Sequence, residues 1–230
     1  MNSPDCAKEI LAFAALRNNQ AVSLKCEEDA LIFYQASLDS LTRLTPSIQA
    51  NTPIKPQLNT KWLSMTHIKY LDEPLCLMLS EILDFPICEA QTIFACIILY
   101  NLALLQQKMK RFGCALQFLD LVDSLFIGDR FLSRVFHPSF SVGLGYQRSC
   151  ILEKLGSLDE SLSIIMSSMS WCSAPENECR SLLPCMMLQM GTSLLQKGFI
   201  EEGKSILDEA NSLNGNKTSS TSSKGPAAAA

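Results

Sequence analysis

The chain has 230 residues, of which 47% are hydrophobic and 18% charged, and its 19 basic and 23 acidic side chains leave a net charge of −4. A chain of this length forms one or two domains and buries a full hydrophobic core without disulfide or metal staples. The acidic balance argues against a broad nucleic-acid-binding face, because phosphate neutralisation needs clustered Lys and Arg.

The first 44 residues predict a helix, a turn and a second helix. An apolar stripe at helical spacing runs from Ile10 to Leu16, and the pair Asn18-Asn19 is expected to interrupt it. The acidic run Glu27-Glu28-Asp29 is typical of the first turn of a helix, where the helix dipole favours negative charge. We interpret residues 1–44 as a degenerate N-terminal helix pair.

Residues 45–92 match no regular pattern and are interpreted as an irregular insertion. Pro46, Pro53 and Pro56 predict a long loop over 45–61, because proline removes a backbone donor and forces its predecessor out of the helical region. Two interpretations of the following stretch remain open. Residues 67–78 form two short extended pieces, giving short strands around 45–87, or a helix begins with Pro74 in its first turn and continues to Leu83.

The helical signal is strong from Cys88 onward. Helices are expected at 88–109, 112–126, 142–155, 158–171, 182–197 and 200–213, and a polar, disordered tail at 214–230. The apolar run from Ile93 to Leu105 is shorter than the roughly 20 residues of a membrane span, so we expect a buried core helix and no membrane span. The expected fold class is therefore mainly α.

Small residues recur at one spacing in three of these helix pairs. In Leu99-Tyr100-Asn101-Leu102-Ala103, the alanine lies twelve residues before Ala115, and Ser149 and Ser161, like Gly191 and Gly203, repeat that spacing. This layout resembles the tetratricopeptide repeat (TPR), although tryptophan is missing at the first signature position and longer connectors separate the copies.

The resemblance implies antiparallel helix pairs stacked as a right-handed solenoid over 93–213, continuous with 1–44 as one domain. The alternative interpretation is an irregular helical bundle with the same periodicity. The resemblance also implies a concave, peptide-binding face formed by the first helix of each pair, and whether residues 45–92 pack over this groove stays open. Its partner-binding residues would be Ile97, Tyr100, Asn101, Leu104, Lys108, Tyr146, Gln147, Cys150, Lys154, Gln189 and Thr192.

Some TPR proteins hold a C-terminal carboxylate with Lys and Asn from consecutive first helices. Asn101 occupies one such position, but Gly143 and Gln147 stand where the next repeat would supply its cations. We therefore expect no intact carboxylate site. The partner implied by the resemblance is a protein or peptide segment, and we expect a non-enzymatic scaffold or adaptor that binds it in a helical-repeat groove.

Catalytic and metal-binding patterns are missing from the sequence. His67 and His137 are the only two histidines, and Cys172, Cys179 and Cys185 lack the C-x₂₋₄-C spacing of zinc modules. We expect no enzyme activity, no metal and no cofactor. Two alternatives remain open: a self-associating structural subunit, since Ile206 and Leu207 in the final helix lack an obvious polar cap, and an enzyme that uses the 45–92 segment.

The sequence also predicts where the protein works. The ten cysteines lie in apolar helical contexts, where a free thiol behaves as a small hydrophobic side chain, and residues 1–10 lack the apolar core of a signal peptide. A reducing compartment is expected, with the cytoplasm ahead of the nucleus.

Overall fold

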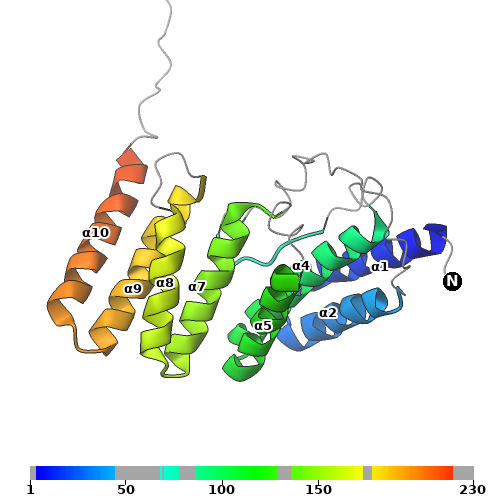
Figure 1. Ribbon diagram of the computed structural model, residues 1–230, viewed down its shortest axis with the longest axis horizontal. Helices are drawn as coiled ribbons and strands as arrows, with labels where there is room; N and C mark the ends of the chain where they lie inside the picture. Colours follow the sequence, from blue (N-terminus) through cyan, green and yellow to red (C-terminus); the bar gives the residue numbers. More distant parts are fainter. Residues whose placement is uncertain are drawn as a thin grey trace, which may run out of the picture. The chain divides into compact units, whose positions relative to one another are not determined.

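The computed structural model describes residues 4–44, 68, 70–77, 86–128, 136–172 and 178–219. This part of the chain is 84% helical and contains eight α-helices, which confirms a mainly α fold (Figure 1). Neighbouring helices pack in antiparallel pairs, as a helical repeat requires.

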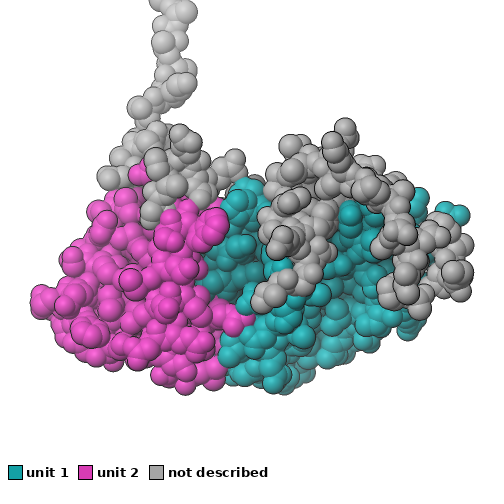
Figure 2. Space-filling view, in the orientation of Figure 1, with its two compact units in different colours: residues 1–147 teal, residues 148–230 magenta. Residues whose placement is uncertain are grey.

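The chain divides into two compact units, residues 1–147 and 148–230 (Figure 2). Helix α7 (Pro138–Lys154) contributes its first ten residues to unit 1 and the rest to unit 2. The other helices of unit 1 are α1 (Pro4–Ser23), α2 (Glu27–Thr42), α4 (Ile87–Lys108) and α5 (Phe112–Gly128). Unit 2 holds α8 (Leu158–Cys172), the 3₁₀-helix η2 (Glu178–Leu182), α9 (Leu183–Gln196) and α10 (Ile200–Ser219).

Each helix pair is joined by a turn of the same length. Three residues separate α1 from α2, α4 from α5, α7 from α8 and α9 from α10. In the last three turns the middle residue has a positive φ: Lys110 at 59°, Gly156 at 84° and Gly198 at 89°. The following amide then donates back to a carbonyl five residues earlier, as in Ser157 N to Leu152 O at 2.9 Å. This Schellman-type ending closes the first helix and starts the second in the opposite direction.

The small residues predicted from the sequence lie at close contacts between the paired helices. The Ser161 hydroxyl is 2.9 Å from both Oγ and the backbone carbonyl of Ser149, across α7 and α8. A Cβ atom added to Gly203 would lie 2.8 Å from Leu195 Cγ and 3.0 Å from the Gly191 carbonyl. Side chains larger than these would push the paired backbones apart.

Helix α4 is the central element of unit 1. It packs against α1, α2 and α5. Its side chains from Ile93 to Leu105 are buried, with the exception of the half-buried Ala95. By length and composition alone α4 could cross a membrane, but two thirds of its apolar window is buried inside the protein, as in a core helix.

Several sequence predictions need correction. Helix α1 continues through Asn18-Asn19 to Ser23, and α10 continues past Leu213 to Ser219. Within residues 68 and 70–77 the structure has no strand, and no helix begins at Pro74; the expected loop at 45–61 lies outside the described residues. The side chains that α10 exposes from Glu201 to Asn214 are all polar, so this helix does carry a polar outer face.

Candidate functional site

The most distinctive feature of unit 1 is a non-helical segment held against the first helices of its pairs. We call residues 68 and 70–77 the inner segment. As the chain proceeds from 68 to 77, its contacts pass from α7 to α4 and then to α1. Leu75 and Leu77 are buried while Cys76 between them is exposed, an alternation typical of extended backbone.

Asparagine side chains bind the backbone of the inner segment. Asn101 of α4 accepts from Leu75 N and donates to Leu75 O, both at 2.8 Å. Asn18 of α1 donates to the same Leu75 carbonyl at 3.0 Å. The neighbouring Asn19 pairs in the same two-way manner with Leu77, accepting from its N–H at 2.7 Å and donating to its carbonyl at 2.5 Å. These contacts involve only backbone groups of the segment and are therefore independent of its side chains.

The N-terminal end of the inner segment is held by α7 and α4. Gln147 Nε2 donates to the Leu71 carbonyl, and the Tyr100 hydroxyl lies 3.4 Å from the same oxygen. The Ile68 amide donates to Ser139 Oγ at 2.8 Å. A Cβ atom at Gly143 would collide with Ile68 Cδ1, so glycine at this position makes room for the Ile68 side chain.

The inner segment has one buried face and one exposed face. Ile68, Leu71, Leu75 and Leu77 are each at most 9% exposed. The intervening Tyr70, Asp72, Glu73 and Cys76 are exposed, and Tyr70 reaches 62%. The segment therefore buries aliphatic side chains at a spacing of three, four and two residues and presents polar groups outward.

The structure places the predicted partner-binding residues in three groups. The α4 residues Ile97, Tyr100, Asn101 and Leu104 are buried, and Tyr100 and Asn101 contact the inner segment, as does Gln147. Lys108, Lys154 and Thr192 are exposed, and Tyr146, Cys150 and Gln189 are half-buried. The inner segment therefore lies against three of the residues that the resemblance assigns to partner binding, Tyr100, Asn101 and Gln147.

Sequence reasoning missed Asn18, Asn19, Ser139 and Gly143 as contacts of this segment. The pair Asn18-Asn19 suggests a helix break because asparagine is a weak helix former. Their position is a better indication that they bind another segment. Both residues lie inside a regular helix, next to its apolar stripe, where a buried amide requires a polar partner.

Amide side chains recur at one register of the first helices. Asn101, Gln147 and Gln189 each lie seven residues before the end of their helix, in α4, α7 and α9. The first two bind the inner segment. Gln189, in unit 2, donates instead to Glu153 Oε2 at 2.5 Å.

Glu153 is the centre of a buried polar network in unit 2. Its carboxylate also accepts from Ser193 Oγ at 3.0 Å, Gln196 Nε2 at 2.9 Å and Lys154 Nζ at 3.1 Å. Burial raises the pKa of this carboxyl, but the hydrogen bonds from Lys154, Gln196 and Ser193 outweigh it, so the pKa is lowered. The network joins α7 to α9, and within unit 2 it occupies the face on which the resemblance places Gln189 and Lys154 as partner-binding residues.

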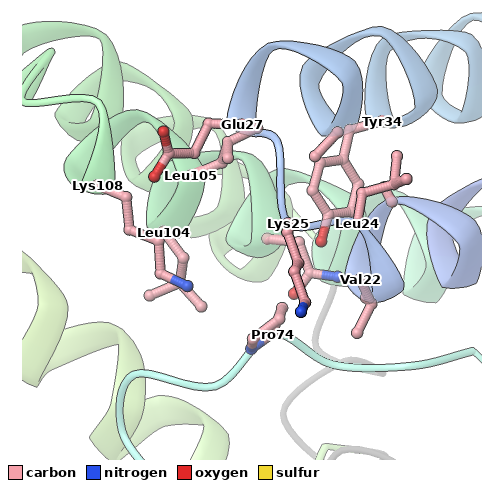
Figure 3. Close-up of a pocket in the computed structure, with 12 residues that line it drawn as sticks. Val22, Leu24, Lys25, Glu27, Tyr34, Pro74, Leu104, Leu105 and Lys108 are labelled. Carbon is pink, nitrogen blue, oxygen red and sulfur yellow. The ribbon is translucent and has the colours of Figure 1, made fainter.

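A small pocket of about 90 Å³ adjoins the inner segment at Pro74 (Figure 3). Leu24, Leu104 and Leu105 supply part of its apolar wall, and Tyr34 closes another side. Burial raises the pKa of the Tyr34 hydroxyl. Lys25 and Lys108 direct their amino groups toward the opening beside Pro74 (Figure 3). Glu27 also lines the pocket, so its charged side chains are two lysines and one glutamate, next to a proline that follows the exposed Asp72 and Glu73 in the chain.

Among the described residues, no group of three or more His, Cys, Asp or Glu side chains could hold a metal ion. The chain matches no protein-family model, no curated protein and no solved structure.

Proposed function

We propose that this protein is a non-enzymatic, TPR-like interaction module that binds an extended segment of a partner protein against the first helices of its pairs. The observation that carries the proposal is the two-way pairing of Asn101 with both backbone groups of Leu75. An amide that binds N–H and C=O of one residue recognises extended chain without requiring a particular side chain. The same face therefore suits segments from other proteins.

The repeat geometry supports the TPR-like, solenoid interpretation. Four helix pairs within the described residues share a three-residue turn, and the small residues of the repeat lie at the close contacts between helices. Stacked pairs of this kind form extended concave surfaces. All ten cysteines lie in the described residues and none of them is in a disulfide, which supports a reducing compartment such as the cytoplasm as the place of action.

Selection from a display library of random 14-residue peptides tests the proposed function. The full chain serves as bait beside Asn19→Ala, Asn19→Ala/Asn101→Ala and, as a matched control, Asn211→Ala on the exposed face of α10. We expect the wild type and the control to enrich peptides that the asparagine variants lose. Because Asn19 is only half-buried, its single variant preserves the test if the double variant fails to fold. Equal enrichment by all four proteins would contradict the proposal.

A self-associating structural subunit is the second candidate, and exposed apolar side chains near the N-terminal helix pair favour it. Phe13 is 42% exposed, Leu16 46% and Ile32 63%. Arg17 packs over the rings of Phe13 and Phe33 and leaves much of this surface uncovered. Self-association through α1 and α2 would cover these side chains. Light scattering of the wild type and Phe13→Ser/Leu16→Ser tests this: a monomeric wild type at all concentrations contradicts it.

A further inference from the structure

The inner segment occupies the very surface that the proposed function assigns to a partner. Its polar contacts to α1, α4 and α7 use backbone groups, and its buried side chains are four aliphatic residues. We propose that the inner segment is an autoinhibitory ligand, which a partner segment of the same chemistry replaces. This inference rests on the proposed function.

Replacement, rather than simple opening, follows from what the segment covers. Asn101 is 1% exposed and Asn18 is fully buried while the segment lies over them. If the segment left and nothing took its place, water would replace the Leu75 contacts of Asn101, and the buried side chains of Leu75 and Leu77 would lose their apolar surroundings. Exposing buried aliphatic side chains and the surface beneath them is unfavourable. The empty site therefore favours a second chain that covers the same surface and restores these contacts.

The partner that fits is an extended acidic segment with aliphatic side chains. Its aliphatic residues would repeat the spacing of Leu71, Leu75 and Leu77, whose side chains are buried. The charged side chains that line the pocket are Lys25, Lys108 and Glu27, which leaves a net positive charge (Figure 3). Acidic residues just before the position of Pro74, where the inner segment has Asp72 and Glu73, would suit that charge. At its other positions the inner segment exposes its side chains, so the sequence of the partner is not constrained there.

Covalent attachment gives the inner segment an advantage over such a partner. A tethered segment competes at an effective concentration in the millimolar range. If the inner segment leaves the groove for only a fraction of the time, the apparent affinity of the groove for a partner peptide is reduced to that fraction of its intrinsic value. Weakening the inner segment should therefore increase affinity for a peptide without changing any residue of α1, α4 or α7.

A labelled peptide of residues 66–79, with Cys76 replaced by Ser, tests the inference by fluorescence polarisation. It is titrated into the full-length wild type and into the full-length Leu75→Ser/Leu77→Ser variant, whose helix content is checked by circular dichroism. We expect at least about tenfold tighter binding to the variant. A peptide that itself carries Leu75→Ser and Leu77→Ser is the control and should bind neither protein.

The outcomes separate this inference from the proposed function. Equal binding of the peptide to both proteins would overturn autoinhibition and leave the groove a peptide-binding site. Binding to neither protein would overturn both proposals. Hydrogen exchange on the wild type supplies a second measurement that needs no variant. We expect the Leu75 and Leu77 amides to exchange at least about tenfold faster than those of buried α4 residues, because the segment opens locally. If these amides were as well protected as those of α4, the inner segment would be a permanent part of the core, and autoinhibition would be overturned.

Discussion

Asn101 of α4 donates through Nδ2 to the side-chain oxygen of Asn18 in α1 at 2.9 Å, while both amides also donate to the Leu75 carbonyl. The two residues are 83 positions apart in sequence, and both are buried. One pair of amides therefore joins two first helices to each other and to the inner segment. This arrangement makes the polar contacts in the interior of unit 1 mutually dependent.

Asn101→Ala should destabilise unit 1 by about 3 kcal/mol, because Leu75 N–H and Asn18 Oδ1 would both lose a buried partner. Urea unfolding followed by circular dichroism measures the loss. The exposed Asn211→Ala in α10 is the control and should change stability by less than about 0.5 kcal/mol. A variant as stable as this control would mean that the asparagine pair contributes nothing.

Glu153 should make stability depend on pH. Its pKa is lower in the folded protein than its usual value, so the carboxylate stabilises unit 2 fully above that usual value of 4.5. The contribution is lost as the pH falls below 4.5 through the folded pKa. Glu153→Gln should lower the melting temperature at pH 7 and reduce the difference between the melting temperatures at pH 7 and at about pH 4.

The control for this measurement is Glu160→Gln, a change to an exposed carboxylate of α8. It should leave the melting temperature and its pH dependence close to those of the wild type. If Glu153→Gln retained the full pH dependence, the network around Glu153 would not be its source.

Much of the helix layout could be predicted from sequence because local signals determine it. The long apolar helix predicted at 88–109 spans Ile87–Lys108, and the second helix of the last pair begins at Ile200 as predicted. The small residues at twelve-residue spacing, Ser149 with Ser161 and Gly191 with Gly203, lie at close contacts between paired helices. Periodicity, acidic first turns and glycine turns are all encoded within a few neighbouring residues.

The candidate site could be predicted only in part, because it depends on contacts between distant positions. The resemblance places Asn101 and Gln147 on the inner face, but nothing local indicates that Leu75 and Leu71 are their partners. The inner segment forms neither helix nor strand in its described residues, so no periodic pattern marks it. Its position follows from the asparagine and glutamine side chains that bind it.

Gly203→Ala should destabilise the α9–α10 pair by about 1–3 kcal/mol, because the new Cβ would meet Leu195 and the Gly191 carbonyl. Gly113→Ala near the start of α5 is the matched control, since a Cβ there has no neighbour within 4 Å. The control should be neutral or stabilising by up to about 1 kcal/mol, as alanine favours helix. Urea midpoints distinguish the two. Equal effects would show that close helix contact does not require Gly203.

Cysteine labelling should follow burial. Cys172 is buried, and burial together with the neighbouring Cys179 raises its pKa to about 12. Because the thiolate is the reactive form, iodoacetamide at about pH 8 should leave Cys172, Cys179 and Cys96 unmodified in the folded protein. The exposed Cys26, Cys88, Cys114 and Cys185 should react. Cys76 should react more slowly than these four, because partial burial of its thiol raises its pKa. Mass spectrometry of digested protein gives the result, and early labelling of Cys172 would contradict the packing of α8.

Gly143→Leu should displace the N-terminal end of the inner segment, since even a Cβ at this position collides with Ile68 and lies 3.4 Å from the Tyr100 hydroxyl. Leucine also favours helix over glycine, so α7 itself should remain formed. The amides of Ile68 and Leu71 should then exchange with solvent faster than in the wild type, because the hydrogen bond from Ile68 to Ser139 is lost. Ser141→Leu, at an exposed position of the same helix, is the control and should leave exchange unchanged. Unchanged exchange in Gly143→Leu would mean that Ile68 does not depend on the space that this glycine leaves.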